Sequence, residues 1–103
     1  MTRLEWTDPA VTDLANIQDY LARDSPEYAD SVIARLILSV ERLKPFPQSG
    51  RAVPEASDLK VRELIVSTYR IIYRVRKGKA QILAVVHSAR NLGGMRPKPW
   101  DAA

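Results

Sequence analysis

Basic side chains gather on consecutive predicted strands in the second half of the chain. They are Lys60, Arg62, Arg70, Arg74, Arg76, Lys77, Lys79 and Arg90. Because side chains alternate across a strand, residues an even number apart project from one face, which groups the basic residues of each strand. The planar guanidinium of arginine bonds two oxygens of a phosphate or a carboxylate at once. The pattern predicts a cationic surface for an anion, and its alternative is a solvated face whose charges keep the protein soluble.

The single histidine, His87, is the candidate for proton transfer near neutral pH. A ribonuclease needs a base that activates a 2′-hydroxyl, an acid for the leaving oxygen and cations for the developing charge. His87 and the arginines would meet part of that need. The alternative is a structural histidine that is hydrogen-bonded to the backbone or to a carboxylate. Among Glu55, Asp58 and Glu63, the spacing singles out no catalytic base.

Composition excludes several other chemistries. The chain has no cysteine, which excludes disulfides, thiolate nucleophiles and cysteine-based metal sites. One histidine is too few for the familiar two- and three-histidine metal sites. We therefore expect neither a metal ion nor a cofactor.

Length and charge bound the class of protein. The chain has 103 residues, 46 % of them hydrophobic and 27 % charged, which predicts one globular domain over residues 1–103. Residues 1–41 carry three basic and eight acidic side chains, a net charge of −5, whereas residues 42–103 carry a net charge of +9. The basic half indicates an anionic partner, either nucleic acid, an acidic protein segment or a membrane surface. The sequence shows neither a signal peptide nor a membrane span, so we expect a cytoplasmic protein without a membrane partner.

The acidic half predicts one strand and two helices. Apolar and polar residues alternate over 3–7, which predicts a short strand. Asp8-Pro9 begins a helix with Asp8 as the capping acceptor, and the apolar face of this helix leaves Asp13 outside. Ser25-Pro26 begins a second helix, which runs until Pro45. The short connection predicts that the two helices form an antiparallel hairpin.

The basic half predicts strands followed by an irregular tail from Asn91 that ends near Trp100. The strand candidates are Ala52-Val53, Leu59–Val66, Tyr69–Arg76 and Gln81–Ala89. The last of these is the most apolar, and we expect it at the centre of the sheet. The fold class is therefore α+β, with an N-terminal antiparallel helical hairpin packed on one face of a mainly antiparallel sheet. The other face of the sheet is expected to be strongly basic.

Four segments carry a family resemblance that extends over nearly the whole chain. They are WTDPAVTDLANIQDYLARDSP, RLKPFPQSGRAVPE, VRELIVSTYRIIYRV and ILAVVHSAR. Their order and spacing resemble the ParE branch of the RelE/ParE superfamily, the toxins of bacterial type II toxin–antitoxin pairs. The resemblance implies a RelE/ParE-like fold and a toxin that poisons DNA gyrase without a catalytic site of its own.

The ribonuclease branch of the same superfamily gives the main alternative. Toxins that resemble RelE cut mRNA in the ribosome with basic strand residues, an arginine at the end of the last strand and a tyrosine six residues later. Matching places are occupied by Lys60, Arg62, Arg70 and Arg90. The tyrosine is replaced by Arg96, whose guanidinium cannot act as a general base. The ParE function is therefore favoured, and a ribonuclease would use Lys60, Arg62, Arg70, His87 and Arg90.

The resemblance also implies partners. A ParD-like antitoxin would have a DNA-binding half and a flexible acidic half that folds around the toxin. We expect this acidic segment to contact Arg62, Arg70, Arg74 and Arg76. The target is expected to bind the C-terminal region, through Arg90, Arg96 and Trp100. We expect no sequence-specific DNA binding by this chain, because both predicted helices lie in the acidic half. A further alternative is a non-toxic relative that only binds an antitoxin.

Overall fold

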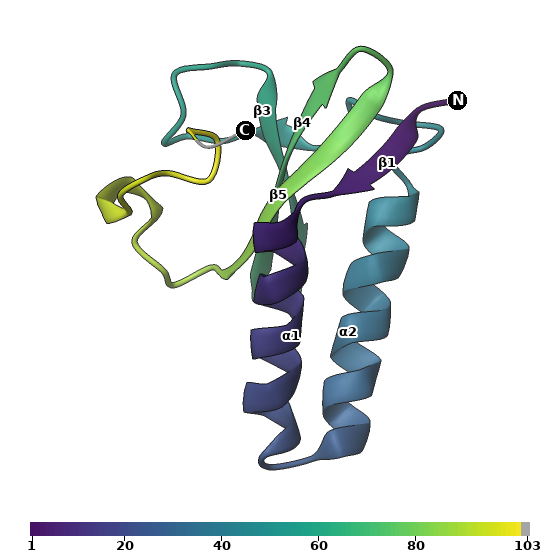
Figure 1. The fold of residues 1–103 in the computed structure, drawn as a ribbon, viewed down its shortest axis with the longest axis vertical. Coiled ribbons are helices and arrows are strands. Elements are labelled where there is room, and N and C mark those ends of the chain that lie inside the picture. The colour runs from purple at the N-terminus through teal and green to yellow at the C-terminus, as the bar shows by residue number, and fades with distance from the viewer. Residues whose placement is uncertain (102–103) are drawn as a thin grey trace.

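Five strands form one sheet in the order β1-β5-β4-β3-β2, and two helices form a hairpin beside it (Figure 1). The computed structural model describes residues 1–101. Its elements are β1 (Arg3–Trp6), α1 (Asp8–Ala22), α2 (Pro26–Glu41), β2 (Arg51–Ala52), β3 (Val61–Val66), β4 (Tyr69–Arg76), β5 (Lys79–His87) and a 3₁₀ turn (Leu92–Gly94). β1 pairs with β5 in parallel, and the other neighbours are antiparallel. The predicted α+β class with a mainly antiparallel sheet is confirmed.

Both helices begin at a hydroxyl cap followed by proline. Thr7, rather than the predicted Asp8, caps α1, because its side chain accepts a hydrogen bond from the amide of Ala10. The same hydroxyl donates to the carbonyl of Ile82 at 2.6 Å, which fixes the start of α1 against β5. Ser25 caps α2. This helix ends at Glu41, before the predicted Pro45, and the chain leaves it in a series of turns.

The strands shift by a few residues from their predicted positions. β4 lies in the middle of the sheet, whereas the most apolar strand, β5, lies between β4 and β1. Ile72 faces Ala84 and Tyr73 faces Ile82, so Leu83 is an extra residue in β5 that forms a bulge. Because of this bulge, the consecutive residues Leu83 and Ala84 both face the side of the sheet opposite the helices.

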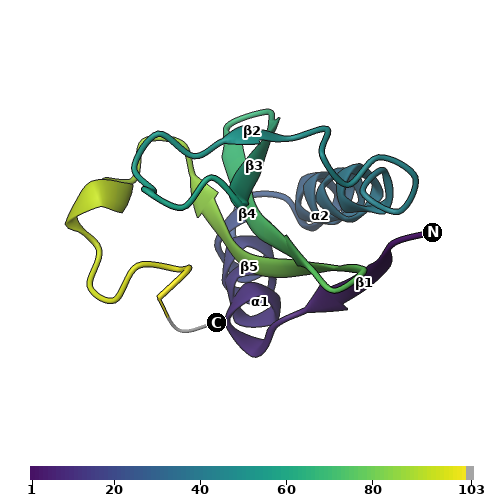
Figure 2. The ribbon, with the colours of Figure 1, turned by 90° about the horizontal axis from the view of Figure 1, so that it is seen from above.

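Both faces of the sheet are covered. The helices cover one face over a core that includes Leu36, Leu43, Ile71, Tyr73 and Ile82. The loop after β2 and the C-terminal tail cover the other face, over a second core that includes Val53, Val61, Ile72, Leu83 and Leu92 (Figure 2). The second face does carry arginines, as predicted, but it is largely covered and is not the open cationic surface that the pattern predicted.

Two arginines of that second face are buried. Arg70 is 7 % exposed and Arg74 is 8 % exposed. The reason is the tail, in which Met95 and Trp100 pack on the second core instead of extending into solvent. No helix within residues 1–101 is long and apolar enough to cross a membrane.

Candidate functional site

Arg70 lies at the centre of a buried charge cluster. Its Nε donates to Oε1 of Glu63 at 2.6 Å, and its two terminal nitrogens donate to the two oxygens of Glu55 at 3.0 and 2.7 Å. The other carboxylate oxygen of Glu63 accepts from Nε of Arg51 at 2.6 Å. The side chain of Glu63 is inaccessible to solvent, so two arginines must hold its charge. The cluster links β2, β3, β4 and the loop after β2.

The cluster fixes the charge state of its members. The hydrogen bond from Arg70 lowers the pKa of the Glu55 carboxyl below its ordinary value. The same bond, with the one to Glu63, raises the pKa of Arg70 above its ordinary value against the opposing effect of burial. Three nitrogens of Arg70 already serve two carboxylates, so a phosphate would have to displace one of them to bind here.

The five candidate ribonuclease residues do not converge. Arg62 lies on the helix side of β3 and donates to the carbonyl of Gly50 at 2.8 Å, whereas Arg70 lies on the opposite face. Lys60 is exposed in the turn before β3. Only His87 and Arg90 share a site, at the far end of β5.

That site is a cleft of about 410 Å³ between α1 and the end of β5, called here the α1–β5 cleft. Its walls include Asp13, Tyr20, Tyr69, His87 and Arg90. Nδ1 of His87 accepts from the amide of Ala89 at 3.0 Å, so Nε2 carries the proton of the neutral ring. The imidazole also meets the ring of Tyr69 edge to face, with centroids 5.6 Å apart. These contacts agree with the predicted alternative, in which His87 is a structural histidine that is hydrogen-bonded to the backbone.

Asp13 closes the open edge of β5 in this cleft. β1 pairs with β5 only as far as Ile82, and beyond that point Oδ2 of Asp13 accepts from the amide of Val85 at 2.9 Å. Burial raises the pKa of the Asp13 carboxyl, although the bond from Val85 and the charge of Arg90 oppose the shift. The prediction that Asp13 lies on the outer face of its helix is wrong.

A second opening, the α2–β3 groove, has a volume of about 320 Å³. β2 pairs only with Arg62 and Glu63, so the edge of β3 is open over residues 64–66. Arg35 of α2 and Arg42, the residue that follows this helix, are exposed and line the opposite wall. Within residues 1–101, neither of these two arginines forms an ion pair. The groove thus combines a free strand edge with unneutralised positive charge.

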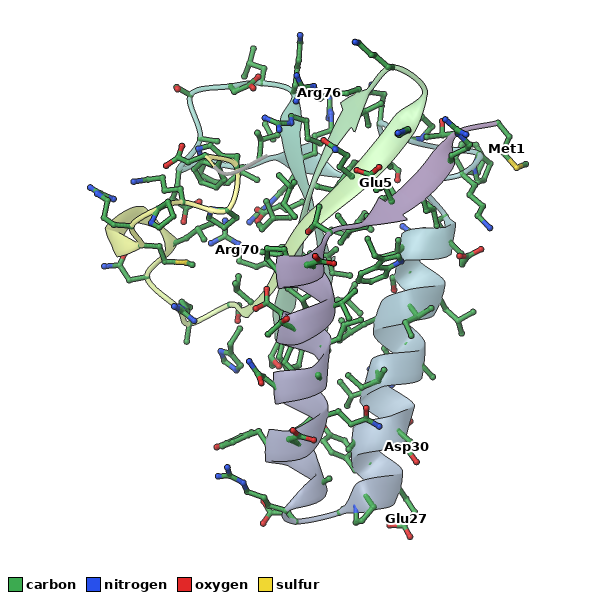
Figure 3. All side chains as sticks on the ribbon, viewed as in Figure 1. Met1, Glu5, Glu27, Asp30, Arg70 and Arg76 are labelled. Atoms are coloured by element: carbon green, nitrogen blue, oxygen red, sulfur yellow. The ribbon has the colours of Figure 1, made fainter. Side chains whose placement is uncertain are left out.

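The remaining predicted contacts lie in three places. Arg76 is exposed near the end of β4 (Figure 3). Arg96 is exposed and donates to the carbonyls of Gly93 and Met95, at 3.0 and 2.8 Å. Trp100 packs against the second core. In the part of the chain that the structure describes, no three His, Asp or Glu side chains are placed to hold a metal ion.

The sequence analysis considered Glu55 and Glu63 only as possible bases and did not predict their pairing with Arg70, nor the contact of Asp13 with β5. Glu63 had a usable signal: by strand alternation it shares a face with Val61, next to the strand that carries Arg70. The position of Glu63 on that face places its negative charge beside Arg70 of the neighbouring strand. No local pattern announces Glu55 or Asp13, because each meets its partner through the tertiary fold.

Comparisons with known proteins identify the family. Residues 4–92 match the model of ParE toxins of the parDE type II toxin–antitoxin system. Toxin RelE2 of Caulobacter vibrioides is 34 % identical over 91 residues, which cover 87 % of this chain and 99 % of that protein. Putative toxin Y4kP of Sinorhizobium fredii is 35 % identical over 88 residues, which cover 84 % of this chain and 88 % of that protein.

Two solved structures share the fold. The chromosomal ParDE toxin–antitoxin system of P. aeruginosa matches with a TM-score of 0.72 and 28 % identity, over 84 % of this chain and 96 % of that chain. The RelBE2 toxin–antitoxin complex of Mycobacterium tuberculosis matches with a TM-score of 0.56 and 20 % identity, over the same shares, 84 % and 96 %. With its helical hairpin, its mainly antiparallel sheet and a family match over residues 4–92, this chain belongs to the ParE toxin family of type II toxin–antitoxin systems.

Proposed function

We propose that this ParE-family toxin poisons DNA gyrase without a catalytic site and is neutralised by a ParD-like antitoxin. The observation that carries the proposal is the pairing of Arg70 with Glu55 and Glu63. This arginine is the candidate cation nearest the middle of the sheet, and two carboxylates of the same chain neutralise it. Phosphate chemistry needs free positive charge at the reacting group.

The α2–β3 groove supports an acidic antitoxin segment as the partner. An extended chain can add to a free strand edge through main-chain hydrogen bonds, here over residues 64–66. Arg35 and Arg42 would meet its carboxylates, and Ile65, which is 50 % exposed, would meet an apolar side chain. Arg70 and Arg74 are too buried for this contact, so the groove arginines take their place in the proposal. The solved P. aeruginosa relative is itself a ParDE system, which agrees with such a partner.

The proposed gyrase-binding surface comprises Arg90, Arg96 and the C-terminal tail, which Trp100 anchors to the second core. Arg90 and Arg96 are both exposed. Truncation after Arg90 is a poor test, because it would remove Leu92 from the second core. Charge reversals at the exposed arginines leave that core intact.

Two matched double variants separate the two surfaces. Arg90→Glu/Arg96→Glu is expected to lose inhibition of gyrase supercoiling and still bind the antitoxin encoded beside it. Arg35→Glu/Arg42→Glu is expected to keep gyrase inhibition and lose neutralisation. Equal behaviour of the two variants in both assays would reject the assignment of two surfaces. Normal growth on induction of the wild-type toxin without its antitoxin would instead favour a non-toxic relative.

A ribosome-dependent endoribonuclease is the second candidate. It is favoured by the shared position of His87 and Arg90 in the α1–β5 cleft, where Nε2 of His87 has no role in the backbone contact. This function predicts codon-phased cuts in mRNA soon after induction. Intact transcripts during growth arrest would reject it.

A further inference from the structure

The end of the β4–β5 hairpin carries a second concentration of positive charge, called here the hairpin site. Arg76, Lys77 and Lys79 line a cavity of about 180 Å³ together with Gln81. Among residues 1–101, the one carboxylate that forms an ion pair with these cations is Glu5, at 3.4 Å from Nζ of Lys79. Positive charge is therefore in clear excess at this end of the sheet.

Gln81 of this cavity faces Arg74, a buried arginine with two nitrogens that are unpaired among the described residues. Arg74 is 8 % exposed, and within residues 1–101 no group accepts a hydrogen bond from its Nε or from its Nη2. Gln81 is its cross-strand partner, and Oε1 of Gln81 also has no donor in that part of the chain. A bridging water could join these atoms, yet it would leave the charge of Arg74 uncompensated. The uncompensated charge of Arg74 adds to the positive potential at the hairpin site.

The charge distribution of the molecule points this end toward a polyanion. Figure 3 shows Arg76 at one end of the long axis, and Glu27 and Asp30 at the other end, near the turn of the helical hairpin. The acidic residues near the turn of the helical hairpin therefore lie far from the hairpin site. In the electric field of a polyanion, such a molecule turns its basic end toward the polyanion.

We infer that the hairpin site binds the phosphodiester backbone of duplex DNA, without sequence specificity. A single carboxylate would neutralise one of the cations, whereas a duplex presents about one phosphate charge per 1.7 Å along its axis. The tip of the β4–β5 hairpin projects away from the helices (Figure 1), so its basic side chains can approach successive phosphates of a duplex. Together with the proposed gyrase surface, this contact would let the toxin touch enzyme and DNA at once.

The test uses the full chain alone, with neither gyrase nor antitoxin, so its failure leaves the proposed function untouched. Fluorescence anisotropy would follow binding to a labelled 20-base-pair DNA of arbitrary sequence. Contacts to three or four phosphates predict an affinity that falls about 40- to 150-fold between 50 and 200 mM salt. The variant Arg76→Gln/Lys77→Gln/Lys79→Gln is expected to bind at least tenfold more weakly, with a shallower salt dependence.

The matched control removes the same formal charge elsewhere. Arg35→Gln/Arg42→Gln/Lys44→Gln is expected to bind DNA within about threefold of the wild type. An RNA duplex of equal length serves as a competing polyanion and should bind no more tightly than the DNA duplex. Equal loss in both variants, no binding at 50 mM salt, or tighter binding of the RNA duplex or of a polyglutamate peptide would each overturn the inference.

Discussion

Arg70 and Glu55 meet through two parallel hydrogen bonds, from Nη1 to Oε2 at 3.0 Å and from Nη2 to Oε1 at 2.7 Å. This fork-to-fork pair joins the middle strand of the sheet to the loop that covers its second face. Glu63 binds the remaining Nε of Arg70 from the neighbouring strand. An arginine held in this way is a structural tie for the loop, and it explains why a basic strand residue need not mark a phosphate site.

Removal of Arg70 should destabilise the fold strongly. Arg70→Ala leaves the inaccessible carboxylate of Glu63 with Arg51 as its remaining partner, and breaking a buried pair in this way costs about 3–5 kcal/mol. Urea denaturation measures the loss. Glu55→Gln is the milder control, because Glu55 is partly exposed and its amide can still accept from Arg70. An Arg70→Ala protein as stable as Glu55→Gln would contradict the role of the cluster.

Acid should weaken the fold through Glu55. Its pKa is lower in the folded protein than its ordinary value of 4.5, so its contribution is fully present above that value and is lost as pH falls through the folded pKa. The free energy of unfolding, measured from pH 7 down to pH 3, should fall more steeply for the wild type than for Glu55→Gln. Superimposable pH profiles would show that this pair does not couple protonation to folding.

Asp13 should behave in the opposite sense. Burial raises its pKa, so its ionised form opposes folding, and the contribution of the protonated form is lost as pH rises through the folded value. Asp13→Asn keeps an acceptor for the amide of Val85 without the buried charge, and at pH 7 it should match or exceed the wild type in stability. Asp13→Ala leaves that amide unpaired and should lose about 1–3 kcal/mol. Thermal unfolding of the wild type and the two variants measures these differences. An Asp13→Asn protein clearly less stable than the wild type would show that the charge itself is stabilising.

The alternation and helix-start signals of the sequence predicted the helices, the strands to within a few residues and the fold class. They could not predict the burial of Arg70 and Arg74, because that depends on a tail whose residues have no regular period. Leu92 and Trp100 are far from β4, the strand that carries both arginines, in the sequence, and they join the second core only in the folded protein. A covering segment without secondary structure is invisible to a reading based on periodicity.

The site was predictable to a smaller extent. His87 and Arg90 do lie together, as neighbours on one chain segment should. The α2–β3 groove was missed, since it arises where the two-residue strand β2 leaves β3 uncovered. The length of an edge strand is decided by the loop that follows it, and the sequence reading placed β2 one residue too late.

Gly50 should tolerate no side chain. A Cβ there would lie 2.6 Å from the carbonyl oxygen of Glu63 and from the hydroxyl of Tyr73. That hydroxyl also accepts from the amide of Gly50 and donates to the carbonyl of Pro47, each at 2.9 Å. Gly50→Ala should therefore cost about 1–3 kcal/mol in urea denaturation. Gly93→Ala, where the nearest atom lies at 3.6 Å, should be near neutral, and equal losses would refute the steric argument.

The most direct test of the central claim is DNA cleavage by gyrase in the presence of the purified toxin. Supercoiled plasmid, gyrase and toxin are incubated, the reaction is stopped with detergent and protease, and linear DNA is quantified. Linear DNA should accumulate with the wild-type toxin, and Arg90→Glu/Arg96→Glu should abolish the effect. Unchanged gyrase activity at toxin concentrations that arrest growth, with mRNA cut in the arrested cells, would contradict the account.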